Sequence, residues 1–214
     1  MAQEILQELR SAIINGDEDL TAAAVKKALD KNLSPQDIMA QGLSAGMRTV
    51  GAKFETGEYF LSDMLVAADA FYVAYNIIKP HLEKEQIEKK AKIVMGVVAG
   101  DIHTIGKDVV VPVLQSEGFD VVDIGIDVPA GEFIKKAKET GAQFIFISSF
   151  LSETTFTEIP KIIEEAKRAG IRDEVKIFVG GPATTTDFAT KVGADGWGKD
   201  AWDALRLTKR WLQR

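Results

Sequence analysis

Apolar residues recur at the spacing of a helical turn from Glu4 to about Leu82, and strand-like alternation is absent from this stretch. The pattern predicts a small all-helical domain in which one stripe of each helix faces a shared core. Turn-forming residues divide the stretch into four segments, and the short connections favour antiparallel packing in a four-helix bundle. The expected breaks between helices fall at Asn15-Gly16, near Asn32 and around Gly57.

The third and fourth helices have the clearest limits. Ser34 supplies a capping hydroxyl directly before Pro35, which suits the first position of a helix. The buried stripe of this third helix continues to Phe54. We expect the fourth helix to run from about Leu61 to Pro80.

The character of the sequence changes across His81–Lys90, a charged segment nearly free of core residues. We interpret this segment as a linker, because the periodicity changes immediately after it. It divides the chain into a helical bundle domain of residues 1–88 and a second domain of residues 89–214. A linker of this length would allow the two domains to move apart.

Beyond the linker, short β-rich apolar runs alternate with amphipathic segments. The apolar runs predict buried parallel strands at Ile93–Val98, Val121–Ile124, Phe144–Ser148 and Ile177–Val179. The amphipathic segments predict helices at Lys107–Glu117, Ala130–Thr140, Phe156–Ala169, Thr184–Lys191 and Asp200–Gln213. This alternation is typical of a doubly wound α/β domain, Rossmann-like or flavodoxin-like, whose ligands bind at the carboxyl ends of the strands.

Composition narrows the functional classes. The net charge of the 214-residue chain is −6 with both signs intermixed, so nucleic acid is not an expected partner. The absence of cysteine excludes disulfides, thiolate metal sites and cysteine nucleophiles. The first ten residues lack the pattern of a secretory leader, and the remainder predicts no membrane span. We therefore expect a cytoplasmic protein.

One of the two histidines lies where a ligand site belongs. His103 follows the first predicted strand, in the loop Gly100–Gly106. Asp101, two residues earlier, can accept the ring N–H and leave the other ring nitrogen as a fixed lone pair. A single histidine without cysteine partners does not hold zinc or iron, so a metal at this position would arrive in a macrocycle. The alternative is a solvated loop histidine with a neighbouring carboxylate.

Three motifs at the ends of predicted strands extend this interpretation. They are Asp101-X-His103-X-X-Gly106, Ser149-X-Leu151 and Gly180-Gly181. Together they resemble the cobalamin-binding domain of methionine synthase and of the corrinoid methyltransferase proteins. The stretch Gly42–Phe71 is similar to the helical cap module that precedes this domain in the same proteins.

The resemblance implies that the benzimidazole of cobalamin leaves the cobalt and that His103 replaces it as the lower axial ligand. Ser149 would hydrogen-bond the buried base of the nucleotide tail, Gly106 would let a helix start approach the tail, and the glycine pair would leave room for the tail to pass. Met64, on the fourth helix of the cap, would cover the upper face of the corrin. The full set of expected cofactor-binding residues is Met64, Asp101, Ile102, His103, Thr104, Ile105, Gly106, Ser149, Leu151, Thr155, Gly180, Gly181 and Trp197.

The resemblance also implies a hydroxyl side chain after the motif Ser149-X-Leu151, called the serine motif below, that hydrogen-bonds Asp101. The matching position in this chain is Thr155. The resemblance thus implies a relay of His103, Asp101 and Thr155. In it, Asp101 would raise the basicity of His103 and favour ligation of Co(III), while Co(I) would release the histidine to take up a proton. A helix N-cap before Phe156 is the alternative role for Thr155.

The function implied is that of a methyl carrier without a complete active site of its own. A substrate-specific methyltransferase would methylate the cobalt, a second methyltransferase would pass the methyl group to a thiol or folate, and a reductive activator would restore the cofactor. Three other classes stay open: an adenosylcobalamin mutase subunit, a cobalamin-dependent sensor, and a flavodoxin-like binder of a phosphorylated ligand. The helical cap argues against the mutase subunit, and the sequence offers no DNA-binding module for a sensor.

Overall fold

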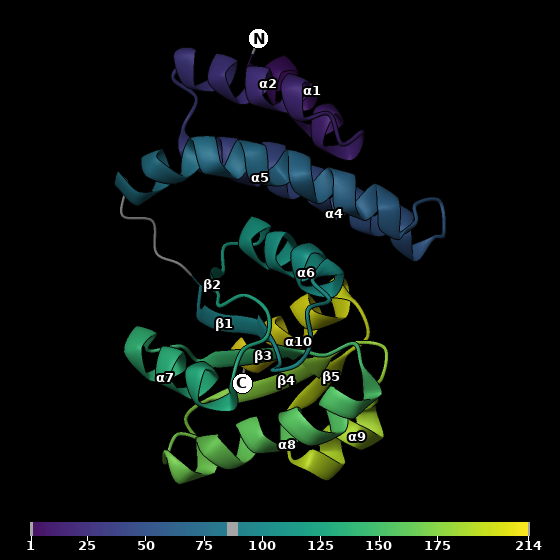
Figure 1. The fold of residues 1–214 in the computed structure, drawn as a ribbon. Coiled ribbons are helices and arrows are strands. Elements are labelled where there is room, and N and C mark those ends of the chain that lie inside the picture. Colours follow the sequence, from purple (N-terminus) through teal and green to yellow (C-terminus); the bar gives the residue numbers. More distant parts are fainter. Residues whose placement is uncertain (1, 85–89, 214) are drawn as a thin grey trace. The chain divides into compact units, whose positions relative to one another are not determined.

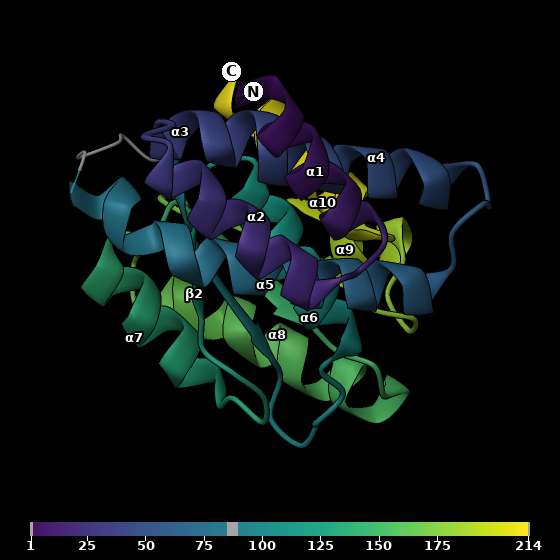
Figure 2. The same cartoon turned by 90° about the horizontal axis from the view of Figure 1, so that it is seen from above.

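The computed structural model describes residues 2–84 and 90–213 and confirms the predicted fold class. The chain divides into two compact units, Met1–Glu88 and Lys89–Arg214. The first contains only helices among its described residues, and the second is a parallel sheet covered by helices. Figures 1 and 2 show each unit from two directions.

The helical unit forms two layers, with α1 and α2 in one layer and α4 and α5 in the other (Figure 1). Side-chain caps start two of its helices, and the cap at Ser34 confirms the predicted start of the third helix. Asp17 accepts a hydrogen bond from the N–H of Leu20 at 2.9 Å, and Ser34 accepts one from Asp37 at 3.0 Å. The elements are α1 (Ala2–Ile14), α2 (Glu18–Asp30), α3 (Pro35–Asp37), the π-helix η1 (Ile38–Leu43), α4 (Ser44–Glu55) and α5 (Leu61–Lys84).

The third predicted helix is one helical stretch, Pro35–Glu55, interrupted by the π-helical turn η1. A Cβ atom added to Gly42 in this turn would lie 2.5 Å from Cδ2 of Leu9, so the wide turn packs closely against α1. The apolar spacing alone did not indicate this π-helical turn, because one extra residue in a single turn leaves most of the apolar stripe of the helix intact.

The fourth helix is longer than predicted. α5 continues through Pro80 to Lys84, so the first four residues of the expected linker, His81–Lys84, are helical. Proline removes one backbone donor and did not end the helix here. Residues 85–89 of the expected linker lie outside the described residues.

The expectation that no segment reaches the length of a membrane span was wrong. Within α5, Leu61–Leu82 has a mean hydropathy of 1.3 over 22 residues and is long enough to cross a bilayer. This helix packs against α1, α2 and α4 and buries Ala67, Phe71, Ala74 and Ile78. A central bundle helix and a membrane span share this composition, so the helix is weak evidence for a membrane.

In the second unit, the described residues form a five-stranded parallel sheet in the order β2-β1-β3-β4-β5. The four predicted strands are confirmed within one or two residues at each end, and the predicted helices are confirmed except that α8 begins four residues earlier. The fifth strand escaped prediction because it has three residues, two of them glycine. The strands are β1 (Lys92–Val97), β2 (Asp120–Asp123), β3 (Phe144–Ser148), β4 (Lys176–Gly180) and β5 (Gly196–Gly198).

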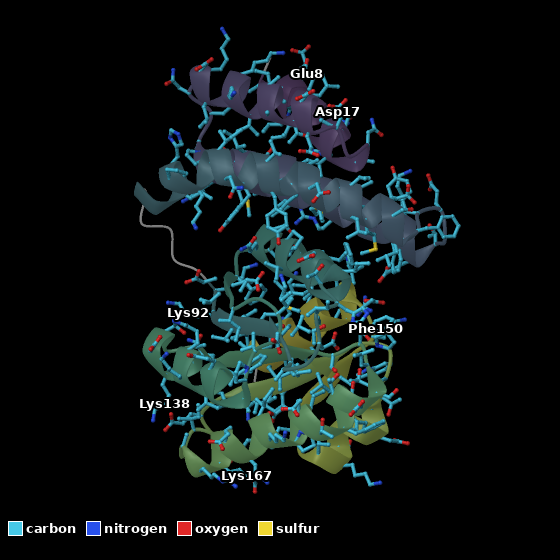
Figure 3. The ribbon with its side chains drawn as sticks, viewed as in Figure 1. Glu8, Asp17, Lys92, Lys138, Phe150 and Lys167 are labelled. Carbon is cyan, nitrogen blue, oxygen red and sulfur yellow. The ribbon has the colours of Figure 1, made fainter. Side chains whose placement is uncertain are left out.

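Helices cover both faces of the sheet, with α6 and α10 on one face and α7, α8 and α9 on the other (Figure 1). The helices are α6 (Ile105–Ser116), α7 (Ala130–Thr140), α8 (Ser152–Arg168), α9 (Thr186–Val192) and α10 (Ala201–Leu212). In Figure 3, Lys92 marks the amino end of the sheet and Phe150 the carboxyl end. All three motifs of the second domain lie at this carboxyl end.

A glycine after β4 allows two loops to meet at that end. Gly181 has a φ of +120°, and a Cβ atom added to it would lie 1.9 Å from the carbonyl oxygen of Ser149. The N–H of Ser149 in turn donates to the carbonyl of Gly180 at 3.1 Å. Gly181 is therefore required for close packing of backbone on backbone.

We expect Gly181→Ala to destabilise the α/β unit by about 2–5 kcal/mol, because backbone strain and overpacking act together. Denaturant unfolding followed by tryptophan fluorescence measures this, since all three tryptophans lie in this unit. Gly131→Ala is the matched control: it lies in α7, and an added Cβ atom would have no neighbour within 4 Å. Equal stability of the two variants would contradict the packing argument.

Candidate functional site

The site is built around a buried carboxylate in the loop that follows β1. Gly100, with a φ of +76°, turns the chain, and its N–H donates to the Asp127 carboxylate at 2.7 Å. The carbonyl of Asp101 accepts the N–H of Asp127 at 3.0 Å. The Asp101 side chain is thereby directed into the protein and is fully buried.

Each oxygen of Asp101 has its own set of donors. Oδ1 accepts the backbone N–H of His103 at 3.0 Å and lies 2.7 Å from Nδ1 of the His103 ring. Oδ2 accepts the N–H of Phe150 at 2.6 Å and that of Leu151 at 3.2 Å. The hydroxyl of Ser149 donates to the same oxygen at 3.3 Å. One carboxylate thus joins the loop after β1 to the loop after β3.

These hydrogen bonds keep Asp101 ionised in spite of its burial. Burial acts to raise the pKa of the carboxyl group, because it disfavours the charged form. Hydrogen bonds from the N–H groups of His103 and Phe150, from the His103 ring and from Leu151 N–H outweigh this effect and lower the pKa to about 2. At neutral pH the site therefore holds a fixed negative charge next to the imidazole.

The contact with Asp101 determines what His103 can do. A carboxylate only accepts hydrogen bonds, so in the neutral imidazole Nδ1 carries the proton and Nε2 keeps an in-plane lone pair. The side chain of His103 is 44% exposed, so this nitrogen is accessible to a ligand. In residues 2–84 and 90–213 no three His, Asp or Glu side chains are grouped to hold a metal ion. A metal on His103 must therefore bring its other ligands with it.

Large apolar side chains surround this histidine at the surface. Exposed apolar patches on soluble proteins mark binding surfaces more often than single exposed residues do. Apolar side chains of this kind would contact the face of a flat macrocycle, and Nε2 of His103 would be available to its metal. The exposed side chains are Ile102 (69%), Ile105 (49%), Phe150 (50%) and Leu151 (40%).

The predicted direct contact between Thr155 and Asp101 was wrong. The Thr155 hydroxyl lies 2.9 Å from the hydroxyl of Ser149 and 2.8 Å from the carbonyl of Leu151. The nearer threonine is Thr154, whose hydroxyl is 3.4 Å from Asp101 Oδ2 and 2.9 Å from Ser149 Oγ. The relay therefore runs from His103 to Asp101 to Ser149, and Thr155 is one hydrogen bond further away.

The start of α8 explains this correction. The helix begins at Ser152, so Thr155 lies inside its first turn and donates back to Leu151, as buried threonines in helices do. The alternative role of Thr155 as an N-cap before Phe156 is wrong for the same reason. Ser149, expected to bond a nucleotide base, already contacts Asp101, Thr154 and Thr155.

The other predicted site residues occupy the same end of the sheet, with one exception. Thr104, Ile105 and Gly106 form the start of α6, which begins at Ile105. The Trp197 ring on β5 donates its N–H to the Thr184 hydroxyl at 2.8 Å, beside the turn of Gly180 and Gly181. Met64 belongs to the helical unit, where it is 2% exposed on the buried face of α5. Its contact with a corrin stays a prediction.

Three residues near the site were missed. Lys107 in α6 is buried and donates to Asp123, the last residue of β2, at 2.6 Å and to Asp108 at 2.9 Å. Burial acts to lower its pKa, but both carboxylates outweigh burial and raise it. Thr154 and Phe150 were also missed. The serine motif leaves its middle position open, and no sequence signal separated Thr154 from Thr155.

Comparison with protein families and known sequences gives consistent matches. A family described as "B12 binding domain" matches residues 91–206, and a second family with the same description matches residues 5–79. A dimethylamine corrinoid protein of Methanosarcina barkeri is 43% identical over 211 residues, covering 98% of each chain. A trimethylamine corrinoid protein of Methanosarcina acetivorans is 42% identical over 205 residues, covering 95% of this chain and 94% of the relative.

Solved structures agree in fold. A cobalamin-binding protein of Desulfitobacterium hafniense superimposes with a TM-score of 0.74 at 30% identity, covering 96% of this chain and 98% of that one. The methanol:cobalamin methyltransferase complex of Methanosarcina barkeri contains a chain with a TM-score of 0.83 at 26% identity. That match covers 98% of this chain and 80% of the other.

Replacement of Asp101 tests the electrostatics of the site in the cofactor-free protein. Because its pKa is lower in the folded state than in the unfolded state, the ionised group stabilises the fold above about pH 4 and loses this effect as the pH falls towards about 2. Between about pH 5 and about pH 2, the free energy of unfolding of the wild type should fall as Asp101 becomes protonated. In Asp101→Asn, which lacks this group, the fall over the same range should be smaller by about 2 kcal/mol. Denaturant unfolding at a series of pH values measures the difference.

The control for this comparison is Asp187→Asn, which removes one exposed carboxylate from the first turn of α9 and corrects for the change in net charge. An Asp101→Asn profile that runs parallel to the wild type in this acidic range would contradict the ionised, hydrogen-bonded state of Asp101.

Proposed function

This chain belongs to the corrinoid proteins with a B12-binding domain, and on that premise we propose that His103 is the lower axial ligand of the cobalt. The cofactor of the protein is a corrinoid, as both matched families and the relatives indicate. The observation that carries the proposal is the 2.7 Å contact between Asp101 and Nδ1 of His103. This contact leaves Nε2 as the donor, among exposed apolar side chains at the carboxyl end of the sheet.

The residues around His103 have distinct tasks in this proposal. Asp101 holds the Nδ1 proton and its negative charge makes the imidazole a stronger donor. Ser149 donates to Asp101, and Thr154 and Thr155 contact Ser149, so the carboxylate stays oriented when the ligand bond strengthens or weakens. The bound corrinoid supplies a cobalt centre that accepts a methyl group in its reduced state and releases it to a nucleophile.

We further propose that the protein is a methyl carrier in a cytoplasmic methyltransferase system. Relatives that match nearly the whole chain are named trimethylamine and dimethylamine corrinoid proteins, and a related structure is a methanol:cobalamin methyltransferase complex. A substrate-specific methyltransferase would methylate the cobalt, and a second methyltransferase would pass the methyl group to a thiol or folate. A reductive activator would restore the cofactor after oxidation.

Binding of hydroxocobalamin tests the axial ligand. We expect the wild type to give the visible spectrum of a histidine-ligated corrin, because Nε2 replaces the benzimidazole. His103→Ala should lose this spectrum while its far-UV circular dichroism stays that of the wild type. The matched control is His81→Ala, which removes the other histidine of the chain, in the last turn of α5. An unchanged spectrum in His103→Ala would refute the proposed ligand.

A further inference from the structure

We propose that Phe150 is a positioning residue, whose ring stacks on the imidazole of His103 and fixes the plane in which Nε2 presents its lone pair. This inference rests on the proposed function of His103 as the cobalt ligand. It adds a residue that the serine motif leaves undefined, since the motif specifies only Ser149 and Leu151.

The two rings are close and nearly parallel. Their centroids are 4.3 Å apart, and the ring planes differ by 19°. The residue is also held at its backbone, because the N–H of Phe150 donates to Asp101 Oδ2 at 2.6 Å. Asp101 holds Nδ1 of His103 through its other oxygen. A single carboxylate therefore holds the His103 ring and the backbone of Phe150.

Ligation and stacking use different directions of the imidazole. The lone pair of Nε2 lies in the ring plane, whereas Phe150 covers a face of the ring. A metal on Nε2 would therefore leave the stack intact. The side chain of His103 remains 44% exposed with Phe150 in place, so the phenyl ring does not close the site.

The hydrogen bond to Asp101 alone does not define the orientation of His103. The bond to Cβ and the hydrogen bond at Nδ1 hold two points of the ring, and small changes of the side-chain torsions can still rotate the ring plane. Contact of a second ring with the imidazole face removes this rotation, because tilting would separate the two surfaces. Nε2 is then held in one direction before the metal binds, which lowers the entropy lost on ligation.

Core packing does not account for the Phe150 side chain. Its surface is 50% exposed in a loop at the carboxyl end of the sheet. Among the described aromatic residues, the ring that stacks on Phe150 is that of His103, and Figure 3 labels Phe150 at the carboxyl end of the sheet. The ring contact of this half-exposed side chain is therefore with His103 and not with the core.

The test compares two phenylalanines of similar exposure. Phe150→Leu keeps an apolar side chain and the backbone N–H to Asp101 but removes the flat ring. Phe156→Leu is the matched control: Phe156 is 58% exposed on α8 and meets Phe188 edge-on, with centroids 5.3 Å apart and ring planes at 78°. Phe150→Tyr retains a ring that can stack and serves as the conservative variant.

Imidazole NMR of the cofactor-free protein gives the first readout. The chain has two histidines, so His81→Gln identifies the His103 resonances. We expect Phe150→Leu to move the His103 ring protons downfield, because the ring current of the stacked phenyl is lost. Phe156→Leu and Phe150→Tyr should leave these protons near their wild-type positions. Unchanged His103 resonances in Phe150→Leu would overturn the stacking arrangement.

The second readout uses the bound Co(II) corrinoid, whose electron paramagnetic resonance separates histidine-ligated from histidine-free cobalt. Phe150→Leu should lower the ratio of ligated to free forms about 2- to 10-fold, the range expected for loss of one aromatic pair. Phe156→Leu and Phe150→Tyr should keep the wild-type ratio. A wild-type ratio in Phe150→Leu would refute the positioning role.

The two proposals fail in distinguishable ways. If His103→Ala also retains the wild-type signal, His103 is not the ligand and the proposed function fails. If His103→Ala loses the signal while Phe150→Leu matches the wild type, the ligand assignment stands and the role of Phe150 fails. If Phe150→Leu does not fold, the test uses Phe150→Tyr, which keeps a ring that can stack. Shifted His103 resonances and a smaller ligated fraction in Phe150→Tyr would overturn the stacking role.

Discussion

The buried carboxylate of Asp101 is the interaction on which the site depends. It accepts backbone N–H groups from His103, Phe150 and Leu151 and contacts the ring of His103. An unpaired charge in this position would be unfavourable by several kcal/mol, so the surrounding donors are needed to keep it ionised. In return, the carboxylate joins the loops after β1 and β3 and determines which imidazole nitrogen is free.

The scaffold makes this arrangement possible through backbone geometry. Adjacent parallel strands β1 and β3 end side by side, so their following loops meet. Gly181 lets the turn after β4 approach the carbonyl of Ser149, which places a third loop at the same edge. Lys107 adds an ion pair between the first turn of α6 and Asp123 at the end of β2. The functional side chains are thus carried by loops whose ends are fixed by the sheet.

Most of the fold could be predicted because its signals are local and periodic. Buried strands such as Phe144–Ser148 and the capped helix start at Ser34 follow from apolar runs and hydrogen-bonding side chains. The π-helical turn and the extension of α5 past Pro80 could not be predicted, since apolar spacing does not reveal a π-turn and a proline usually ends a helix. The loops that form the site could be predicted from the sequence. The hydrogen-bond partners of Thr155 could not, because they depend on where α8 begins.

Phe150 shows a further limit of the sequence. Its motif position carries no required residue type, and only the coordinates reveal the ring stacked on His103. The same limit applies to Ser149, whose hydroxyl contacts Asp101 although a nucleotide base was its expected partner. Spacing along the chain identifies which loops meet, whereas the contacts within them require side-chain positions.

The most direct test of the account is the identity of the nitrogen bound to cobalt. Protein labelled with ¹⁵N only at histidine, loaded with unlabelled cobalamin and reduced to Co(II), should show a doublet superhyperfine splitting in its electron paramagnetic resonance spectrum. A triplet would mean that an unlabelled ¹⁴N, such as the benzimidazole of the cofactor itself, occupies the axial position. That result would contradict ligation by His103.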